Sequence, residues 1–494
     1  MKKAAGIAAG VIIAVGAVAT AGAWFTGTRL EGVLQDLVAQ TNQRAAESAM
    51  GPDGKPQFTT ELVSLDRHLF TSTAHFRLTL HLPNSQPVHF LLVDHIEHGP
   101  FPLSRLASLH LTPAMAVSHG ELENTPDAAK WFALNNGKSP ITSHDTLHYD
   151  RSVESTVTLA PIESKEPGKT LKFSGLTAHI TTTADAQKYE VNAAMDSFSA
   201  DVAGENGPIH ADASGLTLYS GGTKGESGFY LGHTELKLAS GNVQTADQPA
   251  FAVKDFSGGG MMQEVDGKLA AQVNYQIGAL TVGNQLLGGA QMVWKLDNFD
   301  IPATKSLYAL YQSKIVPQQQ AAAAVGMPMQ LNLSDADQKQ LDADLLALLG
   351  AKPHIELETL SLKSANGESH ASAVLDLTSP GTLDAQAPGV GLKAISQMDA
   401  SITLSKPMLM DLATAQAHLQ GQTDKDAVAL QAKNVSDSIS GMAVMTKLGK
   451  DDGDNVTSNL RYADGVVDFN GQKMTPQQFV GFVAGLLQQQ PAQQ

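Results

Sequence analysis

The stretch HFRLTLHL, from His75 to Leu82, decides what kind of fold this chain adopts. Phe76, Leu78, Leu80 and Leu82 alternate in it with polar residues, and that period of two is typical of a β-strand with one buried face. The same alternation recurs in STVTLAPI, AAQVNYQI, QMVWKL, IELETLSL and ASAVLDL. Aromatic residues make up only 5% of the chain and glycines number 44, which predicts an aliphatic core and frequent turns. We therefore expect a mainly β, β-rich α+β fold, built from antiparallel sheet with a few helices.

Some of the predicted strands recur at a regular spacing. Leu176, Leu216 and Phe256, in KFSGLTAHI, DASGLTLYS and AVKDFSGGG, are forty residues apart. On a larger scale GKLAAQVNYQI, from Gly267, resembles GESHASAVLDL, from Gly367, and a Gln-Met strand and an apolar helical segment follow each. This spacing predicts hairpin units added side by side to a long sheet. The simpler alternative is that any all-β chain places its strands at similar intervals.

Helical patterns interrupt the strands. After the N-terminus, an apolar stripe that includes Leu34 and Val38 can pack on the body of the protein or on a second copy. Ser334 and Thr475 are placed to cap two later helices, whereas the low-complexity VPQQQAAAAVGMPM predicts a mobile connection. The expected organisation is a membrane helix over 1–25, an amphipathic helix over 26–50, β-rich regions over 57–315 and 351–472, a helix over 330–350, and a C-terminal helix and tail over 475–490.

The N-terminal segment indicates where the protein resides. Two lysines precede an uncharged run of twenty-two residues, Ala4 to Phe25, and a bilayer-spanning helix needs about 20 residues. The lysines favour a cytoplasmic N-terminus, and the aromatic pair at the end of the run suits a membrane interface. Cleavage after Ala23 as a signal peptide is the alternative. We expect a single-pass inner-membrane protein, anchored through residues 4–25, with its C-terminal domain in the periplasm.

Composition excludes several classes of function. The chain has no cysteine, so neither disulfides nor thiolate metal sites are available. Its formal net charge is −16 and it has no basic cluster, which argues against a nucleic-acid partner. No G-x-S-x-G, H-E-x-x-H or G-x-G-x-x-G motif occurs. We therefore predict no cofactor and assign no catalytic residue.

The histidines are concentrated in the first third of the chain. Ten of the sixteen lie between His68 and His148, and imidazoles with nearby carboxylates are the ligands of transition-metal sites. If VDHIEH is extended, however, adjacent residues point to opposite faces of the strand. One face then carries His95 and Glu97 and the other carries Asp94 and His98, so ordinary solvated or core histidines are the simpler interpretation. The candidate metal ligands are His89, Asp94, His95, Glu97 and His98.

Three further motifs carry a family resemblance. They are IEHGPFPLSRL from Ile96, GAWFTGTRLE near the anchor, and RYADGVVDFNGQKMTPQQF from Arg461. Together they resemble the YdgA-like family of Gram-negative envelope proteins of unknown function. The resemblance implies an N-terminal membrane anchor and a large envelope domain, and it supplies no catalytic residue. The motif residues are Trp24, Gly27, His98, Gly99, Pro100, Phe101, Asn470 and Gly471, where Gly99–Pro100 predicts a turn and Asn470–Gly471 a type I′ hairpin turn.

These observations leave three functional hypotheses. The first is a non-catalytic envelope scaffold or binding module, which could act as a homodimer. The second is a lipid-handling protein in which the aliphatic face of a long sheet accommodates an acyl chain. The third is a metal-dependent hydrolase that uses the histidine-rich third. Convergence of His89, His95 and His98 on a carboxylate would favour the hydrolase, and a continuous apolar face would favour lipid handling.

Overall fold

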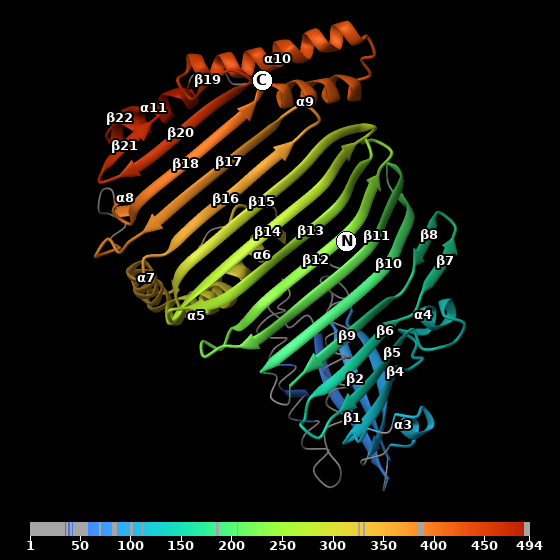
Figure 1. Ribbon diagram of the computed structural model, residues 1–494. Coiled ribbons are helices and arrows are strands. Elements are labelled where there is room, and N and C mark those ends of the chain that lie inside the picture. Colours follow the sequence, from blue (N-terminus) through green and yellow to red (C-terminus); the bar gives the residue numbers. More distant parts are fainter. Residues whose placement is uncertain are drawn as a thin grey trace. The chain divides into compact units, whose positions relative to one another are not determined.

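A computed structural model of the chain describes residues 58–68, 71–81, 86–98, 102–110, 112–183, 187–204, 206–324, 327–329, 331–383 and 390–488, and residues 35, 38, 39 and 42 before them. The described residues form two compact units (Figure 1). Unit 1 draws on 1–201, 214–234 and 307–338, and unit 2 on 202–213, 235–306 and 339–494. The fold is mainly β with few helices, as the alternating sequence patterns predict.

Unit 1 is built on an antiparallel sheet whose strands pair mostly with their neighbours in sequence. The exception is a hairpin, β7 (Ile162–Glu166) with β8 (Lys169–Phe173), which comes between two strands that pair with each other, β6 and β9. The order is β1 (Phe58–Arg67), β2 (Thr71–Leu80), β3 (Val88–His98), β4 (Ala116–Leu122), β5 (Ile141–Leu147), β6 (Val153–Leu159), β9 (Leu176–Thr182) and β10 (Lys188–Gly204).

One face of this sheet, the inner face, forms the core of unit 1. Phe76 and Leu78 are at most 1% exposed, so the alternation in HFRLTLHL is confirmed over β2, whereas Leu82 lies outside the described residues. The short helices α3 (Leu103–Ala107) and α4 (Ala129–Leu134) follow β3 and β4, and Phe132 of α4 is buried in the core. Val38, from the predicted apolar stripe, also packs against it.

A helical residue is bonded to the outermost strand of the unit 1 sheet. The side-chain amide of Asn42 donates to the Thr60 carbonyl oxygen at 2.8 Å, and its Oδ1 accepts from the Thr60 backbone N–H at 2.7 Å. An asparagine amide carries the same donor and acceptor as a peptide group. At this point of β1 the side chain therefore stands in for a neighbouring strand.

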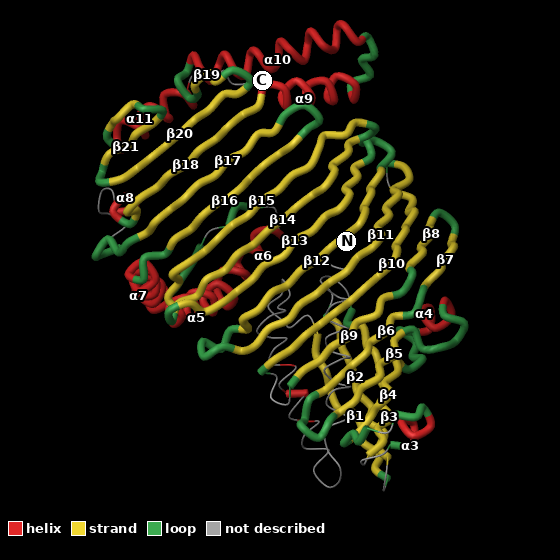
Figure 2. The backbone as a smooth tube through the Cα atoms, in the orientation of Figure 1, coloured by secondary structure: helices red, strands yellow, loops and turns green. Residues whose placement is uncertain are grey.

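The strands of unit 2 are also antiparallel, and several of them are longer (Figure 2). Two strands that contribute residues to both units precede them in the chain, β11 (Gly207–Lys224) and β12 (Tyr230–Gln244). The order of the unit 2 strands is β13 (Phe251–Val265), β14 (Lys268–Val282), β15 (Gln285–Asp300), β16 (His354–Lys363), β17 (Glu368–Leu377), β18 (Ile395–Ser405), β20 (Asn455–Ala463), β21 (Val466–Phe469) and β22 (Gln472–Met474), and β19 (Lys450–Asp452) pairs with β20 beside β21.

The regular spacings in the sequence correspond to hairpins. Leu176, Leu216 and Phe256 lie in β9, β11 and β13, so forty residues is the length of two successive strands and their turns. The two larger units are also alike, because β14–β15 and β17–β18 are antiparallel hairpins that each lead directly into a helix. Asn470 and Gly471 have φ values of 54° and 84°, which confirms the predicted type I′ turn between β21 and β22.

Two helices begin at the caps that the sequence predicts. Ser334 Oγ accepts from the Asp337 N–H at 3.2 Å, and Thr475 Oγ1 accepts from the Gln478 N–H at 3.2 Å, which confirms both predicted caps. Phe479 and Phe482 pack on Phe469, at ring distances of 5.4 and 5.8 Å. The helices after α4 are α5 (Ile301–Leu310), the π-helical η1 (Tyr311–Ile315), α6 (Val316–Ala324), α7 (Asp335–Gly350), α8 (Val390–Lys393), α9 (Lys406–Leu419), α10 (Lys425–Met445) and α11 (Pro476–Gln488).

One prediction about these helices is wrong, and the predictions for the N-terminal anchor and for several motif residues cannot be compared with the structure. The run VPQQQAAAA forms helix α6 instead of a mobile connection, because alanine and glutamine are good helix formers. The anchor over 1–25 with Trp24, as well as Gly27, Gly99, Pro100 and Phe101, lies outside the described residues. In the part of the chain that is described, no helix is long and apolar enough to cross a bilayer.

Candidate functional site

The five candidate metal ligands all lie on β3, and the strand divides them as the alternation predicts. Asp94 is 2% exposed on the inner face, next to Ile96, whereas His95 is exposed on the opposite, outer face. Each histidine bonds a different neighbour: His89 Nδ1 lies 3.0 Å from Thr79 Oγ1, and His98 Nε2 lies 2.9 Å from Ser72 Oγ. Over the described ranges, no group of three or more His, Asp or Glu side chains is arranged to hold a metal ion.

Strand pairing instead brings together histidines that are far apart in the sequence. His95 on β3 pairs with His119 on β4, and His119 pairs with His144 on β5. Paired residues in an antiparallel sheet point to the same face, so the three imidazoles lie side by side on the outer face. Threonines extend this row on both sides, with Thr73 next to His95 and Thr156 next to His144.

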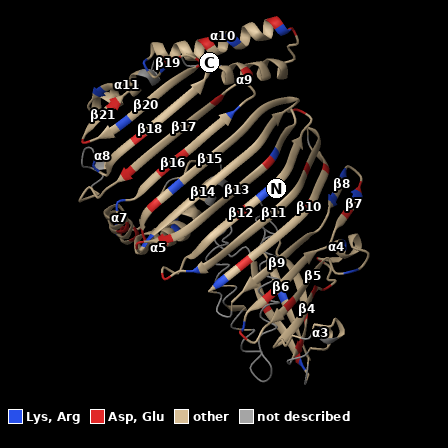
Figure 3. Ribbon diagram, viewed as in Figure 1, with Lys and Arg blue, Asp and Glu red and all other residues tan. Residues whose placement is uncertain are grey.

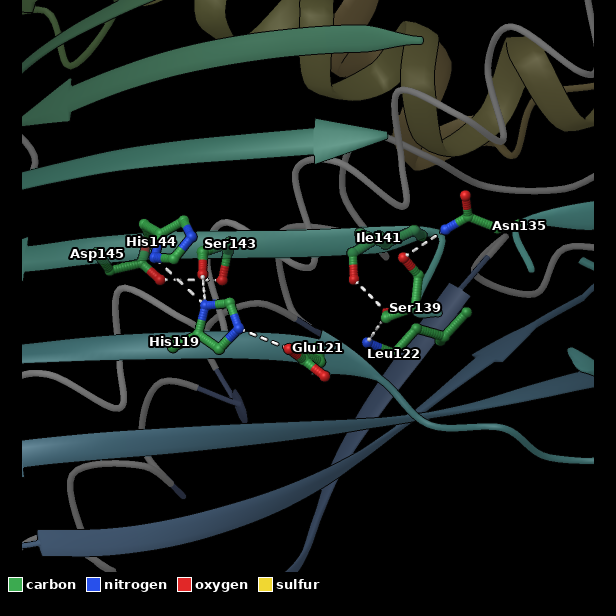
Figure 4. Close-up of polar contacts among 9 residues, drawn as sticks. All are labelled: His119, Glu121, Leu122, Asn135, Ser139, Ile141, Ser143, His144 and Asp145. Atoms are coloured by element: carbon green, nitrogen blue, oxygen red, sulfur yellow. Dashed lines mark hydrogen bonds and ion pairs between the residues drawn. The ribbon is translucent and has the colours of Figure 1, made fainter. Parts of the chain in front are cut away.

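His119 is held between two acceptors (Figure 4). Its Nδ1 lies 3.1 Å from the Ser143 carbonyl oxygen, and its Nε2 lies 2.6 Å from Glu121 Oε1. A carbonyl oxygen and a carboxylate both only accept, so the two contacts are satisfied together when both ring nitrogens carry protons. These two contacts fix the orientation of the His119 ring.

His144 stacks on His119. Their ring centres are 4.4 Å apart and the two Nδ1 atoms are 3.3 Å apart. Partial burial, together with the neighbouring His119, lowers the pKa of His144, and Glu121 offsets this only in part. A neutral His144 can present Nδ1 as an acceptor toward His119.

Beneath these rings the inner face carries two buried carboxyl groups. Burial raises the pKa of Asp145 to about 6, although the hydroxyls of Ser155, Ser143 and Ser118 partly offset it. Ser143 Oγ donates to Asp145 Oδ2 at 3.0 Å. Burial, and then the Asp145 charge, raise the pKa of Asp94 well above its ordinary value. Within the described structure neither oxygen of Asp94 has a hydrogen-bond partner, so the pair is costly to ionise.

A glycine makes room for this pair. Gly120 on β4 lies between Asp94 and Ser143, with which it is paired. A Cβ at this position would stand 2.5 Å from Ser143 Oγ and 3.7 Å from Asp94 Oδ1. The absence of a side chain at residue 120 is therefore what allows two polar groups to enter the inner face here.

The outer face of unit 1 borders a cavity of about 1010 Å³, which we call the histidine cavity. One side is the sheet, which contributes His95, His119, His144 and His148, and the other is α3 with the residues after it, which contribute Arg105 and His110. Glu97 fixes α3 to the sheet, because its Oε2 accepts from the Ser104 N–H at 2.9 Å and from Ser104 Oγ at 3.0 Å. Most of the other lining residues carry hydroxyl groups.

The sheet of unit 2 has a face of the opposite character. Three adjacent rows of paired residues, which we call the apolar face, contain no charged side chain. None of their members on β14–β18 is buried: Leu360 is 45% exposed and Ile402 is 53% exposed. The rows are Met262, Ala271, Leu296, Ile355, Leu375, Met398, Tyr462, Val467 and Met474; Gly260, Val273, Trp294, Leu357, Ala373, Ala400, Leu460 and Phe469; and Gly258, Tyr275, Met292, Leu360, Ala371, Ile402 and Ser458.

The other face of the same sheet is polar. Lys295 Nζ lies 2.8 Å from Glu358 Oε1, and Arg461 Nε lies 3.8 Å from Asp399 Oδ1. Acidic and basic residues are both scattered along these strands, without a patch of one sign (Figure 3). A shallow pocket of about 230 Å³ on this side is bordered by Asp399, Arg461 and Asp468. Charge on one face and aliphatic groups on the other make the sheet amphipathic.

One feature of the sequence indicates the histidine row, although the alternating pattern alone does not. AVSHGEL and ITSHDTL, which become β4 and β5, both contain Ser-His at the centre of an alternating run. In each, Ser118 or Ser143 faces inward and the next residue, His119 or His144, faces outward. The shared dipeptide predicts equivalent positions on two strands, but it does not reveal that the strands are neighbours.

Comparisons with known proteins agree with the family resemblance. A family model described as "Bacterial protein of unknown function (DUF945)" matches residues 1–477. "Protein YdgA" of Escherichia coli K12 is 26% identical over 97% of this chain and 96% of its own. "Uncharacterized protein YihF" of the same organism is 24% identical over 96% of this chain and 97% of its own. No solved structure matches the chain.

Proposed function

Since this chain belongs to the DUF945 family of bacterial proteins of unknown function, we infer its function from its own structure and propose that it is a non-catalytic protein that binds the acyl chains of lipids on the apolar face of unit 2. The observation that supports this most directly is the exposure of that face. Large apolar side chains on five adjacent strands, β14–β18, remain partly accessible to solvent. An extended apolar surface of this kind marks an interaction site in a folded protein.

Side-chain chemistry favours an acyl chain over a protein as the occupant. The three rows offer mainly aliphatic and aromatic groups, and their hydroxyls are those of Ser458, Tyr275 and Tyr462, so a partner gains little from polar contacts there. Many positions are small, including Gly258, Gly260, Ala373 and Ala400, and offer few projecting side chains that could interlock with a rigid partner. A flexible hydrocarbon chain adapts to such a surface and gains about 0.8 kcal/mol for each methylene removed from water.

The same proposal includes a place in the cell. The uncharged run over 4–25 supports insertion in the inner membrane with the two units in the periplasm, close to a supply of lipid. Washing isolated membranes with alkaline carbonate should leave the chain in the pellet with integral proteins. Release of the full-length chain into the supernatant would contradict an anchor.

Crosslinking from single positions in living cells tests lipid binding. Benzoylphenylalanine, a photoreactive residue, replaces Ile402 on the apolar face, and cells are grown with radioactive acetate to label acyl chains. After illumination, we expect radioactivity to remain with the denatured full-length chain. Replacing Leu360, two positions away in the same row, with lysine should reduce that label about tenfold, since a charge there removes contact with roughly two methylenes.

The matched control is the next residue. Thr403 lies on the same strand but points to the polar face, in the row that contains His370 and Thr457. Benzoylphenylalanine at position 403 should carry little label. Equal labelling at 402 and 403 would contradict the proposal, and a crosslinked product of twice the chain mass at 402 would identify a second copy as the occupant instead.

A further inference from the structure

The histidine cavity of unit 1 combines a fixed positive charge with a donor that lacks a partner among the described residues. Arg105 Nη2 donates to the Thr112 carbonyl oxygen at 3.2 Å and to Thr112 Oγ1 at 2.7 Å, which holds the loop after α3. Its Nε is buried and has no hydrogen-bond partner in the described structure. A guanidinium group stays protonated at any pH a protein survives, so this charge faces the cavity permanently.

The acidic groups around the cavity are already engaged. Glu97 accepts two hydrogen bonds from Ser104, and Glu154 lies 3.5 Å from His148 Nε2. Glu121 is paired with His119. Asp145 also borders the cavity, but its side chain is 2% exposed and is bonded to Ser143 on the inner face. Among the described residues around the cavity, no carboxylate is therefore left to balance Arg105.

The imidazoles change the balance with pH. His95 and His110 contact only hydroxyl groups, Thr73 Oγ1 at 3.4 Å and Ser108 Oγ at 3.1 Å, and His148 contacts Glu154. An imidazole gains a proton near pH 6.5 in the absence of special interactions. Histidine is therefore the type of lining residue through which pH can change the charge of the cavity. Burial, and then His119, lower the pKa of His144.

We propose that the histidine cavity binds a small oxyanion of the phosphate class, held by Arg105, by protonated histidines and by the hydroxyl groups of the lining. Charge-assisted hydrogen bonds from guanidinium and imidazolium groups are the strong contacts in such sites. The lining also suits an oxyanion because it offers many hydroxyl donors and only two apolar residues, Ile96 and Val117. This site belongs to unit 1 and is argued independently of the apolar face of unit 2.

Isothermal titration of the purified full-length chain with inorganic phosphate tests the proposal. We expect binding at about pH 5.5 that weakens about tenfold or more by about pH 8, because an ordinary imidazole loses its proton between these values. Replacing His95 with glutamine should weaken binding at the lower pH about tenfold through the loss of one charged donor. Arg105→Gln should do at least as much at both pH values.

A matched variant separates this effect from a general change in the sheet. His179 is on the outer face in the same row, paired with Thr156, but does not border the cavity. His179→Gln should bind phosphate as the unaltered chain does. The His95→Gln change leaves the Arg105–Thr112 contacts in place. The proposal is overturned if the folded chain does not bind phosphate at about pH 5.5. It is also overturned if His179→Gln weakens phosphate binding as much as His95→Gln does.

A second titration distinguishes two sources of the phosphate group, a lipid headgroup and a free anion. Titration with dihexanoyl phosphatidic acid, a short-chain lipid with a phosphate monoester, is compared with titration by inorganic phosphate. Tighter binding of the lipid would assign the cavity to a lipid headgroup, and equal or weaker binding would assign it to a free anion. Both outcomes support an oxyanion site, provided that His95→Gln weakens the binding of both ligands.

Discussion

Replacing Asp145 with asparagine should raise the free energy of unfolding at pH 8 by about 3 kcal/mol. The folded protein holds this carboxyl group at a pKa of about 6, against 3.8 for an ordinary aspartate. Each unit of that difference corresponds to 1.36 kcal/mol of differential stability. Below pH 3.8 the carboxyl group is protonated whether the chain is folded or unfolded. As the pH rises toward 6 only the unfolded chain ionises, so stability falls, and the penalty then persists at higher pH. Asparagine cannot ionise and keeps an oxygen that accepts from Ser143.

Denaturant unfolding of the full-length chain between pH 4 and pH 8 measures this effect. The unaltered protein should lose stability across the range, and Asp145→Asn should show a flatter profile. Asp247→Asn, in the exposed turn between β12 and β13, is the control and should follow the unaltered protein. Parallel profiles for the unaltered protein and Asp145→Asn would show that the buried carboxyl group carries no such penalty.

Phe76→Ala should cost about 3–5 kcal/mol of folding free energy, the range for large-to-small changes in a packed core. The ring is 0% exposed in the middle of β2, among the residues of the unit 1 core. Truncation there loses the transfer energy of the ring and leaves a cavity that its neighbours fill only in part. Denaturant unfolding of the intact chain provides the measurement.

Leu360→Ala is the informative comparison. It removes a large side chain from an alternating strand as well, but that side chain is 45% exposed on the apolar face. We expect a loss below about 1 kcal/mol, because roughly half of the apolar area is already in contact with water. Equal losses at the two positions would mean that the apolar face is packed as tightly as a core, which would remove the basis for lipid binding.

Local features of the fold could be predicted because local interactions produce them. The period of two in HFRLTLHL identifies a strand and its inner face, the hydroxyls of Ser334 and Thr475 satisfy free N–H groups at helix starts, and Asn470–Gly471 tolerates positive φ at both positions. The division of His95 and Asp94 between two faces follows from the same alternation. The prediction for the alanine-rich run VPQQQAAAA was wrong, because its low complexity was given more weight than the helix propensity of its residues.

The sites themselves depend on information that is not local. His95, His119 and His144 meet because β3, β4 and β5 pair in one register, and a shift of one residue would send every side chain to the other face. IELETLSL alternates much as HFRLTLHL does, apart from one irregularity between Leu357 and Leu360, yet Phe76 is buried and Leu360 is not. What covers a sheet is determined by the rest of the chain, so the pattern identifies an apolar face without showing whether it is a core or a binding surface.

The bond between Asn42 and Thr60 has a consequence for the behaviour of the protein in a crowded compartment. A strand at the margin of a sheet exposes N–H and C=O groups that can recruit a strand from another molecule, and repeated addition of this kind leads to amyloid-like polymers. At Thr60 both groups are already taken by an amide from the same chain. The protein thus blocks, at this position, the template from which intermolecular β-polymerisation could start.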